Sequence, residues 1–200
     1  MSDSMVTEAA NDLAICRRQL ADNRASTLVL VEGLSDAQML WRPGPRSWSI
    51  AECFLHMLAA ARPYLGAIDA GIERARAKGF LLLGSRPARH PWLARVFVES
   101  FEPPPRIRYP TPKQFLPPAP RGPSTVIIGD FMRLGDEIGD RLDRAEGLDL
   151  GKPVVVSPVS SVLRLSLGLS FALLSVHERR HLYQARTITR REAFPAAVMA

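Results

Sequence analysis

The sequence predicts an all-α chain, folded as a four-helix bundle in a single domain that spans residues 1–200. Four long segments repeat apolar residues at three- and four-residue steps, the period of an amphipathic helix. Two capping-box sequences mark helix starts, and no segment shows a convincing strand pattern. The hydrophobic content of 46% in 200 residues is enough to bury one sizeable core.

The first helix is expected over residues 7–33, with Gly33 at its C-terminal stop. Its apolar stripe is interrupted at Asn23 and Arg24. Next, Ser35 and Gln38 form a capping box that predicts one short helical turn. Residues 41–48 are rich in proline and predict a loop.

The second helix is expected to begin after Ser49, which forms a capping box with Glu52 directly before an apolar run. It should extend to about Ala77, with Gly79 beyond its end. Pro63 lies inside this pattern and predicts a kink, because proline removes one hydrogen bond of the helix.

Residues 84–123 predict a long Pro-rich loop between the second and third helices. Nine of the 21 residues from Pro103 to Pro123 are proline, which excludes a helix there. One helical turn is expected between Trp92 and Val98. Several aromatic residues in the loop need burial, so we expect it to lie over the bundle as ordered chain.

The third helix is expected over residues 125–146, with Ser124 as its N-cap. Residues 147–156 predict a connector, and Ser157 with Pro158 predicts a short turn. The last helix should begin near Ser166 and continue to about Arg191.

The composition argues against several classes of protein. The net charge is +6, but the basic residues are scattered and interspersed with acids, so nucleic-acid binding is not favoured. No apolar stretch is long enough to span a membrane, and the N-terminal residues do not resemble a secretory signal. The two cysteines, Cys16 and Cys53, are too few for a disulfide scaffold. We therefore expect a cytoplasmic protein.

The histidines point to a metal site. His177 and His181 are one helical turn apart, on the apolar face of the last helix. Two imidazoles placed in this way can chelate one transition metal, although such a pair also arises by chance. His56 lies in an apolar run of the second helix, where a polar ring needs a partner. A metal shared with the facing helix would supply one.

Two segments resemble the signatures of the DinB-like superfamily: residues 34–56, which contain Trp41, Trp48 and His56, and the run from His177 to Gln184. The resemblance implies a four-helix bundle with up-down-down-up order. It also implies a divalent metal, Zn²⁺ or Ni²⁺, on three histidines that correspond to His56, His177 and His181. Characterised relatives include S-transferases and isomerases that use bacterial low-molecular-weight thiols.

The neighbours of these histidines have simpler interpretations. Glu52 is expected to complete its capping box. Gln184 either orients an imidazole or makes a hydrogen bond elsewhere in the bundle. Glu178 is expected to be a surface charge. His90 is expected to be exposed on the loop, and Cys53 to be buried in the core.

Three further residues have no predicted contact with a ligand. Trp41 and Trp48 are expected to anchor their loop, and no role is assigned to Tyr183. We also expect residues from Phe101 to Pro120 to return to the metal site and set substrate access, because the loop is long enough to cross the bundle.

The function predicted from these observations is that of a metal-dependent enzyme, such as a thiol S-transferase or a hydrolase, acting on a small molecule at an open three-histidine site. The alternative is a non-catalytic, stress-related protein that binds metal or a small ligand. No catalytic residue is identified. A homodimer is expected, with contacts through Leu28, Val29 and Leu30 on the first helix.

Overall fold

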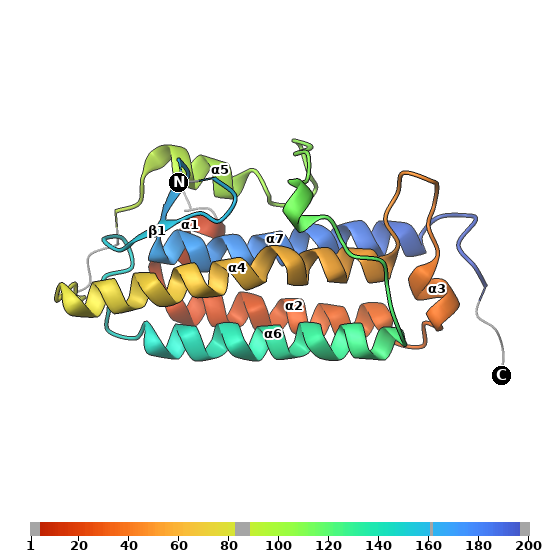
Figure 1. Cartoon of the computed structure of the whole chain (residues 1–200), viewed down its shortest axis with the longest axis horizontal. Helices are drawn as coiled ribbons and strands as arrows, with labels where there is room; N and C mark the ends of the chain where they lie inside the picture. Colours follow the sequence, from red (N-terminus) through yellow and green to blue (C-terminus); the bar gives the residue numbers. More distant parts are fainter. Residues whose placement is uncertain (1–4, 83–88, 161, 197–200) are drawn as a thin grey trace.

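The computed structural model describes residues 5–82, 89–160 and 162–196. The chain is mostly helical, which confirms the all-α prediction, and it carries one small sheet (Figure 1). None of the described helices combines the length and apolar composition needed to cross a lipid bilayer. The elements are α1 (Met5–Asn11), α2 (Leu13–Val31), α3 (Asp36–Leu40), α4 (Ile50–Ala77), α5 (Trp92–Glu99), the 3-10 turn η1 (Lys113–Phe115), α6 (Ser124–Arg144), β1 (Val154–Val156), β2 (Arg164–Ser166) and α7 (Leu167–Thr189).

Four long helices, α2, α4, α6 and α7, lie side by side and enclose the hydrophobic core. Helices α7 and α6 each contact both α2 and α4. In Figure 1, α2 and α7 run in one direction, while α4 and α6 run in the other. Because α4 and α6 are parallel, the segment between them must return along the length of the molecule.

The predicted first helix is divided in two. Asp12 has an extended backbone, and its carboxylate accepts a hydrogen bond from the N–H of Ala14 at 2.7 Å, so it caps the start of α2. The preceding helix α1 packs against α7. The predicted stop is confirmed, because Gly33 adopts a φ of +70° directly after α2.

Both predicted capping boxes are confirmed. The side chains of Ser35 and Ser49 accept hydrogen bonds from the backbone of Gln38 and Glu52, whose side chains accept bonds from the serine N–H groups in return. Helix α4 continues through Pro63 to Ala77.

Ser124 is the first residue of α6, not its N-cap. The N-cap is Pro123, which offers no side-chain bond, and Ser124 donates both its N–H and its hydroxyl to Asp36. These two hydrogen bonds lower the pKa of the Asp36 carboxyl. Ser124 therefore connects the start of α6 to α3, a role that the capping pattern alone does not indicate.

The expectation of no strands is wrong in one place. β1 and β2 form an antiparallel pair in which Val155 is opposite Leu165. Each strand has only three residues, too few for a recognisable alternation. The pair leads directly into Ser166, whose side chain accepts a hydrogen bond from the N–H of Leu169 and caps α7. The predicted start of the last helix is thus confirmed.

The expected dimer surface is only partly exposed. Leu28 and Val29 are exposed at 53% and 73%, but Leu30 belongs to the core. The homodimer stays a prediction, and only the first two of these residues are available to a partner.

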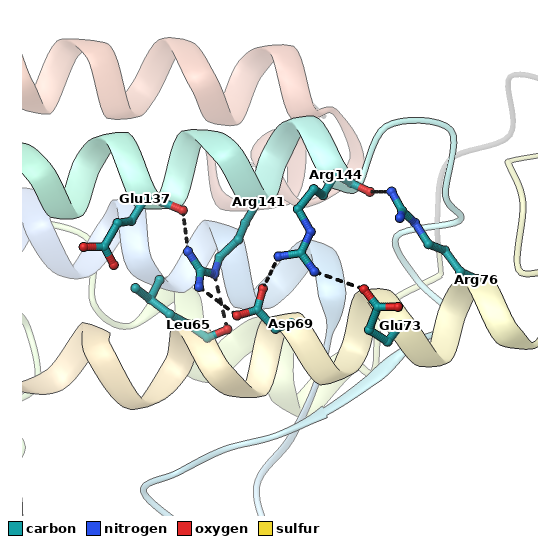
Figure 2. Close-up of polar contacts among 7 residues, drawn as sticks. All are labelled: Leu65, Asp69, Glu73, Arg76, Glu137, Arg141 and Arg144. Carbon is teal, nitrogen blue, oxygen red and sulfur yellow. Dashed lines mark hydrogen bonds and ion pairs between the residues drawn. The ribbon is translucent and has the colours of Figure 1, made fainter.

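A cluster of ion pairs joins α4 to α6 (Figure 2). The carboxylate of Asp69 accepts hydrogen bonds from Arg141 at 2.7 Å and from Arg144 at 2.5 Å. Arg144 also pairs with Glu73 at 3.0 Å, and Arg76 donates to the carbonyl oxygen of Arg144 at 2.8 Å. Asp69 is thus the shared acceptor of two guanidinium groups.

We predict that Asp69→Asn lowers the free energy of unfolding by about 1–2 kcal/mol, because two partly buried arginines lose their shared carboxylate. Urea denaturation at low salt measures the change. The control is Glu73→Gln, because the Glu73 side chain is 64% exposed; the expected loss is about 0.5 kcal/mol or less. Equal losses in the two variants would contradict this account.

Candidate metal centre

The structure brings together the three histidines that the sequence singled out. His56 comes from α4, and His177 and His181 come from consecutive turns of α7. One ring nitrogen of each lies within 4.8 Å of the others. The Nε2 atom of His177 is 3.2 Å from the Nε2 atoms of both His56 and His181.

Two of the three nitrogen–nitrogen separations match those between the ligands of a tetrahedral metal. Zinc–nitrogen bonds of about 2.0–2.1 Å place two ligand nitrogens of a tetrahedron about 3.3–3.4 Å apart. The two separations of 3.2 Å are close to that value. Three protein ligands leave a fourth position open.

In His56 and His181, the hydrogen bond at Nδ1 determines which ring nitrogen carries the proton. His56 donates its Nδ1–H to the carbonyl oxygen of Phe115 at 2.7 Å, and His181 donates its Nδ1–H to Oε1 of Gln184 at 3.0 Å. Both acceptor oxygens can only accept, so in neutral rings both Nε2 atoms carry a lone pair. Both lone pairs face His177 Nε2, which has one proton at most. The group therefore has the donors that a cation requires.

The surroundings favour neutral imidazoles. Burial lowers the pKa of His56. Burial, together with the nearby His56 and Arg180, lowers the pKa of His177 to about 3. The pKa of His181 is also well below its usual value, because of burial and the two neighbouring imidazoles. Neutral imidazole is the form that binds metal.

Aromatic rings flank the three histidines. The Trp48 ring lies 4.7 Å from the His56 ring and 5.9 Å from the His181 ring, between centroids. Trp48 therefore contacts the candidate ligands as well as ending its loop. Trp41 lies at the other end of that loop and packs edge-on against Phe194, with 5.6 Å between ring centroids.

The Pro-rich segment returns to this site, as predicted. Phe115 in η1 supplies the carbonyl oxygen for His56, and the Phe101 ring lies 6.0 Å from the His177 ring. The described structure has no α-helix from Pro103 to Pro123, as expected, but this stretch does contain the short 3-10 turn η1. The expected turn near Trp92 is confirmed as α5. Residues 83–88 lie outside the described part of the chain.

Two consecutive arginines of α7 hold this segment. Arg179 forms an ion pair with Glu102. Arg180 donates to the carbonyl oxygens of Ser100 at 3.3 Å and Ile107 at 2.6 Å, and its guanidinium lies 5.3 Å from the Phe101 ring centroid. The helix that carries two of the candidate ligands thus also positions the aromatic ring beside them.

Two predictions about single residues are wrong. Glu178 is buried, and its carboxylate accepts a hydrogen bond from Asn23 of α2 at 3.0 Å. Burial raises its pKa to about 7. His90 is half-buried, and its ring nitrogens contact the Ser166 hydroxyl at 2.6 Å and Asn11 Oδ1 at 3.2 Å. Each makes a long-range contact that its local sequence does not indicate.

The position of Glu178 has a chemical consequence. The run from His177 to His181 has the H-E-x-x-H spacing in which the glutamate of a zinc protease acts as general base. Here Glu178 contacts α2, whereas the candidate ligands face His56 on α4. It is therefore not placed to act on a group held by the histidines.

The remaining neighbours agree with their predicted roles. Glu52 completes its capping box and pairs with Arg42. Gln184 orients the His181 imidazole, which settles the alternative left open by the sequence. Cys53 is fully buried. Tyr183 is 41% exposed, and nothing in the described structure gives it a role at the site.

One family model, described as the DinB superfamily, matches residues 19–185. The matched range includes all three histidines and most of the 200 residues. No curated protein and no solved structure matches the chain.

We predict that His177→Ala abolishes stoichiometric metal binding, because the remaining two nitrogens lose their shared neighbour. Elemental analysis of untagged protein measures the metal per chain. The variant should also lose the metal-induced rise in melting temperature that the wild type shows, since a metal bound only to the folded state stabilises it. Equal metal content in the two proteins would remove His177 from the site.

We predict that Gln184→Leu weakens metal binding by about 10–100-fold, the usual cost of removing a hydrogen-bond partner from a ligating histidine. The matched control is Gln184→Glu, which keeps an acceptor for His181 Nδ1 and should bind at least as well as the wild type. Competition with a chelator measures both affinities. An unchanged affinity in the leucine variant would show that this hydrogen bond does not support the site.

Proposed function

The chain belongs to the DinB superfamily, and we propose that it binds one divalent transition metal, Zn²⁺ or Ni²⁺, through His56, His177 and His181. The observation that carries the proposal is the pair of Nε2 lone pairs directed at His177. The hydrogen bonds of His56 to Phe115 and of His181 to Gln184 hold them there. Bound metal would neutralise the repulsion between these lone pairs.

We propose further that the site is catalytic, with a low-molecular-weight thiol as co-substrate. Three neutral imidazoles leave the double charge of the ion uncompensated, and no carboxylate of the described chain contacts the three rings. Such a site favours an anion in its open position. When bound, the metal would act as a Lewis acid that keeps a thiol deprotonated near neutral pH.

The chain's own cysteines do not qualify as that thiol. Cys16 and Cys53 are fully buried, and burial raises the pKa of each to about 12. A buried, protonated thiol is a poor nucleophile. The nucleophilic sulfur would therefore come from a small molecule.

The aromatic rings suggest the second substrate. Trp48 and Phe101 flank the histidines and offer apolar surface to a small electrophile. In the transfer, the thiolate sulfur forms a bond to the electrophilic carbon, and the leaving group departs with its electron pair. The protein's contribution is to position both reactants, because this reaction needs no further proton from a side chain.

A non-catalytic protein that binds metal or a small ligand is the second candidate. It is favoured by one observation: within the described residues, no acidic or hydroxyl side chain contacts the three imidazoles to serve in acid–base chemistry. This candidate function uses the same three metal ligands as the proposed enzyme and differs only in that no substrate is converted.

The proposed setting is the cytoplasm, with the helices forming a four-helix bundle that pairs as a homodimer and does not act on nucleic acid. The two buried, unpaired cysteines suit a reducing compartment. Several arginines are already paired with acids, among them Arg17, Arg24 and Arg144. Paired arginines are less available to phosphates.

We predict metal-dependent conjugation of a fluorogenic alkyl halide, monochlorobimane, with a panel of small thiols that includes cysteine and coenzyme A. Fluorescence measures the rate for protein loaded with Zn²⁺ or Ni²⁺. His56→Ala should reduce the rate to the uncatalysed level, because one ligand is lost. The control Tyr183→Phe changes a residue that is 41% exposed and makes no hydrogen bond to the three imidazoles, and it should keep the wild-type rate.

A rate that is the same with loaded and metal-free protein would contradict catalysis. If the protein nevertheless holds one metal per chain, that result would favour the non-catalytic candidate.

A further inference from the structure

A second candidate site lies between α2 and α6, away from the metal centre. It is a cavity of about 180 Å³, lined by apolar residues and glycines of the two helices, by the charged residues Arg17, Arg24 and Asp136, and by Glu178 of α7. None of the three histidines lines it. Leu20, Phe131 and Leu142 provide apolar walls.

Two glycines of α6 create much of this space. Gly135 and Gly139 are one helical turn apart and both line the cavity. A Cβ added at Gly139 would meet nothing within 4 Å, and one at Gly135 would meet only Arg24 Nη1 at 3.9 Å. Neither glycine has a positive φ, so the backbone conformation does not require glycine at either position. Each lowers helix stability by about 1 kcal/mol relative to alanine. The open space is therefore not a requirement of the fold.

Glu178 is the buried charged residue of the cavity, whereas Arg17, Arg24 and Asp136 are more exposed charged residues of its lining. Glu178 is only 6% exposed, and Asn23 donates one amide hydrogen to its Oε2. The second amide hydrogen of Asn23 goes to the carbonyl oxygen of Ser175. Within the described chain, no donor is hydrogen-bonded to Oε1 of Glu178.

The nearby arginines are already paired with other acids. Arg17 pairs with Asp143 and Glu146 at 2.7 and 3.2 Å, and Arg24 pairs with Asp136 at 2.9 Å. Arg17, Arg24 and Asp136 line the cavity with side chains that are 36%, 48% and 68% exposed, and within each pair the charges largely cancel.

The charge of Arg179 also acts on Glu178 and by itself lowers the pKa of its carboxyl. Arg179 acts on this carboxylate only through space, because its guanidinium donates to Gln19, Ser175 and Glu102. A buried carboxylate without a direct counter-ion is unfavourable, and a cation in the cavity would relieve this.

We propose that this cavity binds a small organic cation, with a primary ammonium group against Glu178 and a short apolar body between α2 and α6. An apolar cavity of about 150 Å³ accommodates benzene. The 180 Å³ measured here therefore fits an aromatic ring or a short alkyl chain that carries one aminomethyl group. The ammonium would donate to Oε1 of Glu178, and the apolar walls would cover the body.

The probe is benzylammonium, compared with benzyl alcohol, which has nearly the same shape and no charge. Each is titrated into the full-length protein, and calorimetry gives the affinity. We expect benzylammonium to bind at one per chain and at least about tenfold more tightly than the alcohol, because a charge-assisted hydrogen bond is lost in the alcohol.

Two variants test separately the charge of Glu178 and the volume of the cavity. Glu178→Gln keeps the size of the side chain and an acceptor for Asn23, and should remove the preference for benzylammonium. Gly139→Leu fills the cavity with a side chain and should abolish binding of both probes. Leucine also has a higher helix propensity than glycine, so α6 should remain folded. His177→Ala should leave binding of benzylammonium unchanged, which distinguishes this site from the metal centre.

Three results would overturn the proposal: no saturable binding of benzylammonium at millimolar concentration, equal affinity for the alcohol, or full benzylammonium affinity in Gly139→Leu. Thermal unfolding of each variant checks the fold. If Glu178→Gln does not fold, the comparison of the two probes on the wild type and on Gly139→Leu still decides the outcome.

Discussion

The hydrogen bond from His56 Nδ1 to the carbonyl oxygen of Phe115 is the contact on which the candidate metal centre depends. It fixes the His56 tautomer, so that the Nε2 lone pair faces the two histidines of α7. It also holds the Pro-rich segment against α4. The same hydrogen bond thus orients a candidate ligand and positions the Pro-rich segment beside it.

The parallel arrangement of α4 and α6 explains why that segment is long and why it reaches the site. A parallel pair requires the chain to return along the whole of α4 before α6 begins. The return is held by Arg179 and Arg180 of α7 and by Phe115 at His56. Its prolines lower the conformational entropy lost when the segment becomes ordered.

Helix α7 serves two different environments. One side carries His177 and His181 toward α4, where burial keeps the imidazoles neutral. Another side carries Ser175 and Glu178 toward Asn23 of α2. This polar contact accounts for the interrupted apolar stripe of α2, because Asn23 is buried as a hydrogen-bonding residue. The two environments are separate, so a ligand in the α2–α6 cavity would occupy a site of its own.

The sequence by itself determined the main helices and the pair His177 and His181, because both rest on spacing within one helix, whereas His56 was added through its resemblance to a family signature. The capping boxes at Ser35 and Ser49 and the pair His177 and His181 are local patterns of this kind. Tertiary structure alone decided the acceptor for His56, the burial of Glu178 and the contacts of His90. Their partners, Phe115, Asn23 and Ser166, lie 59, 155 and 76 positions away in the chain. Hydrogen bonds over such separations form only when helices pack, and no local period in the sequence encodes them.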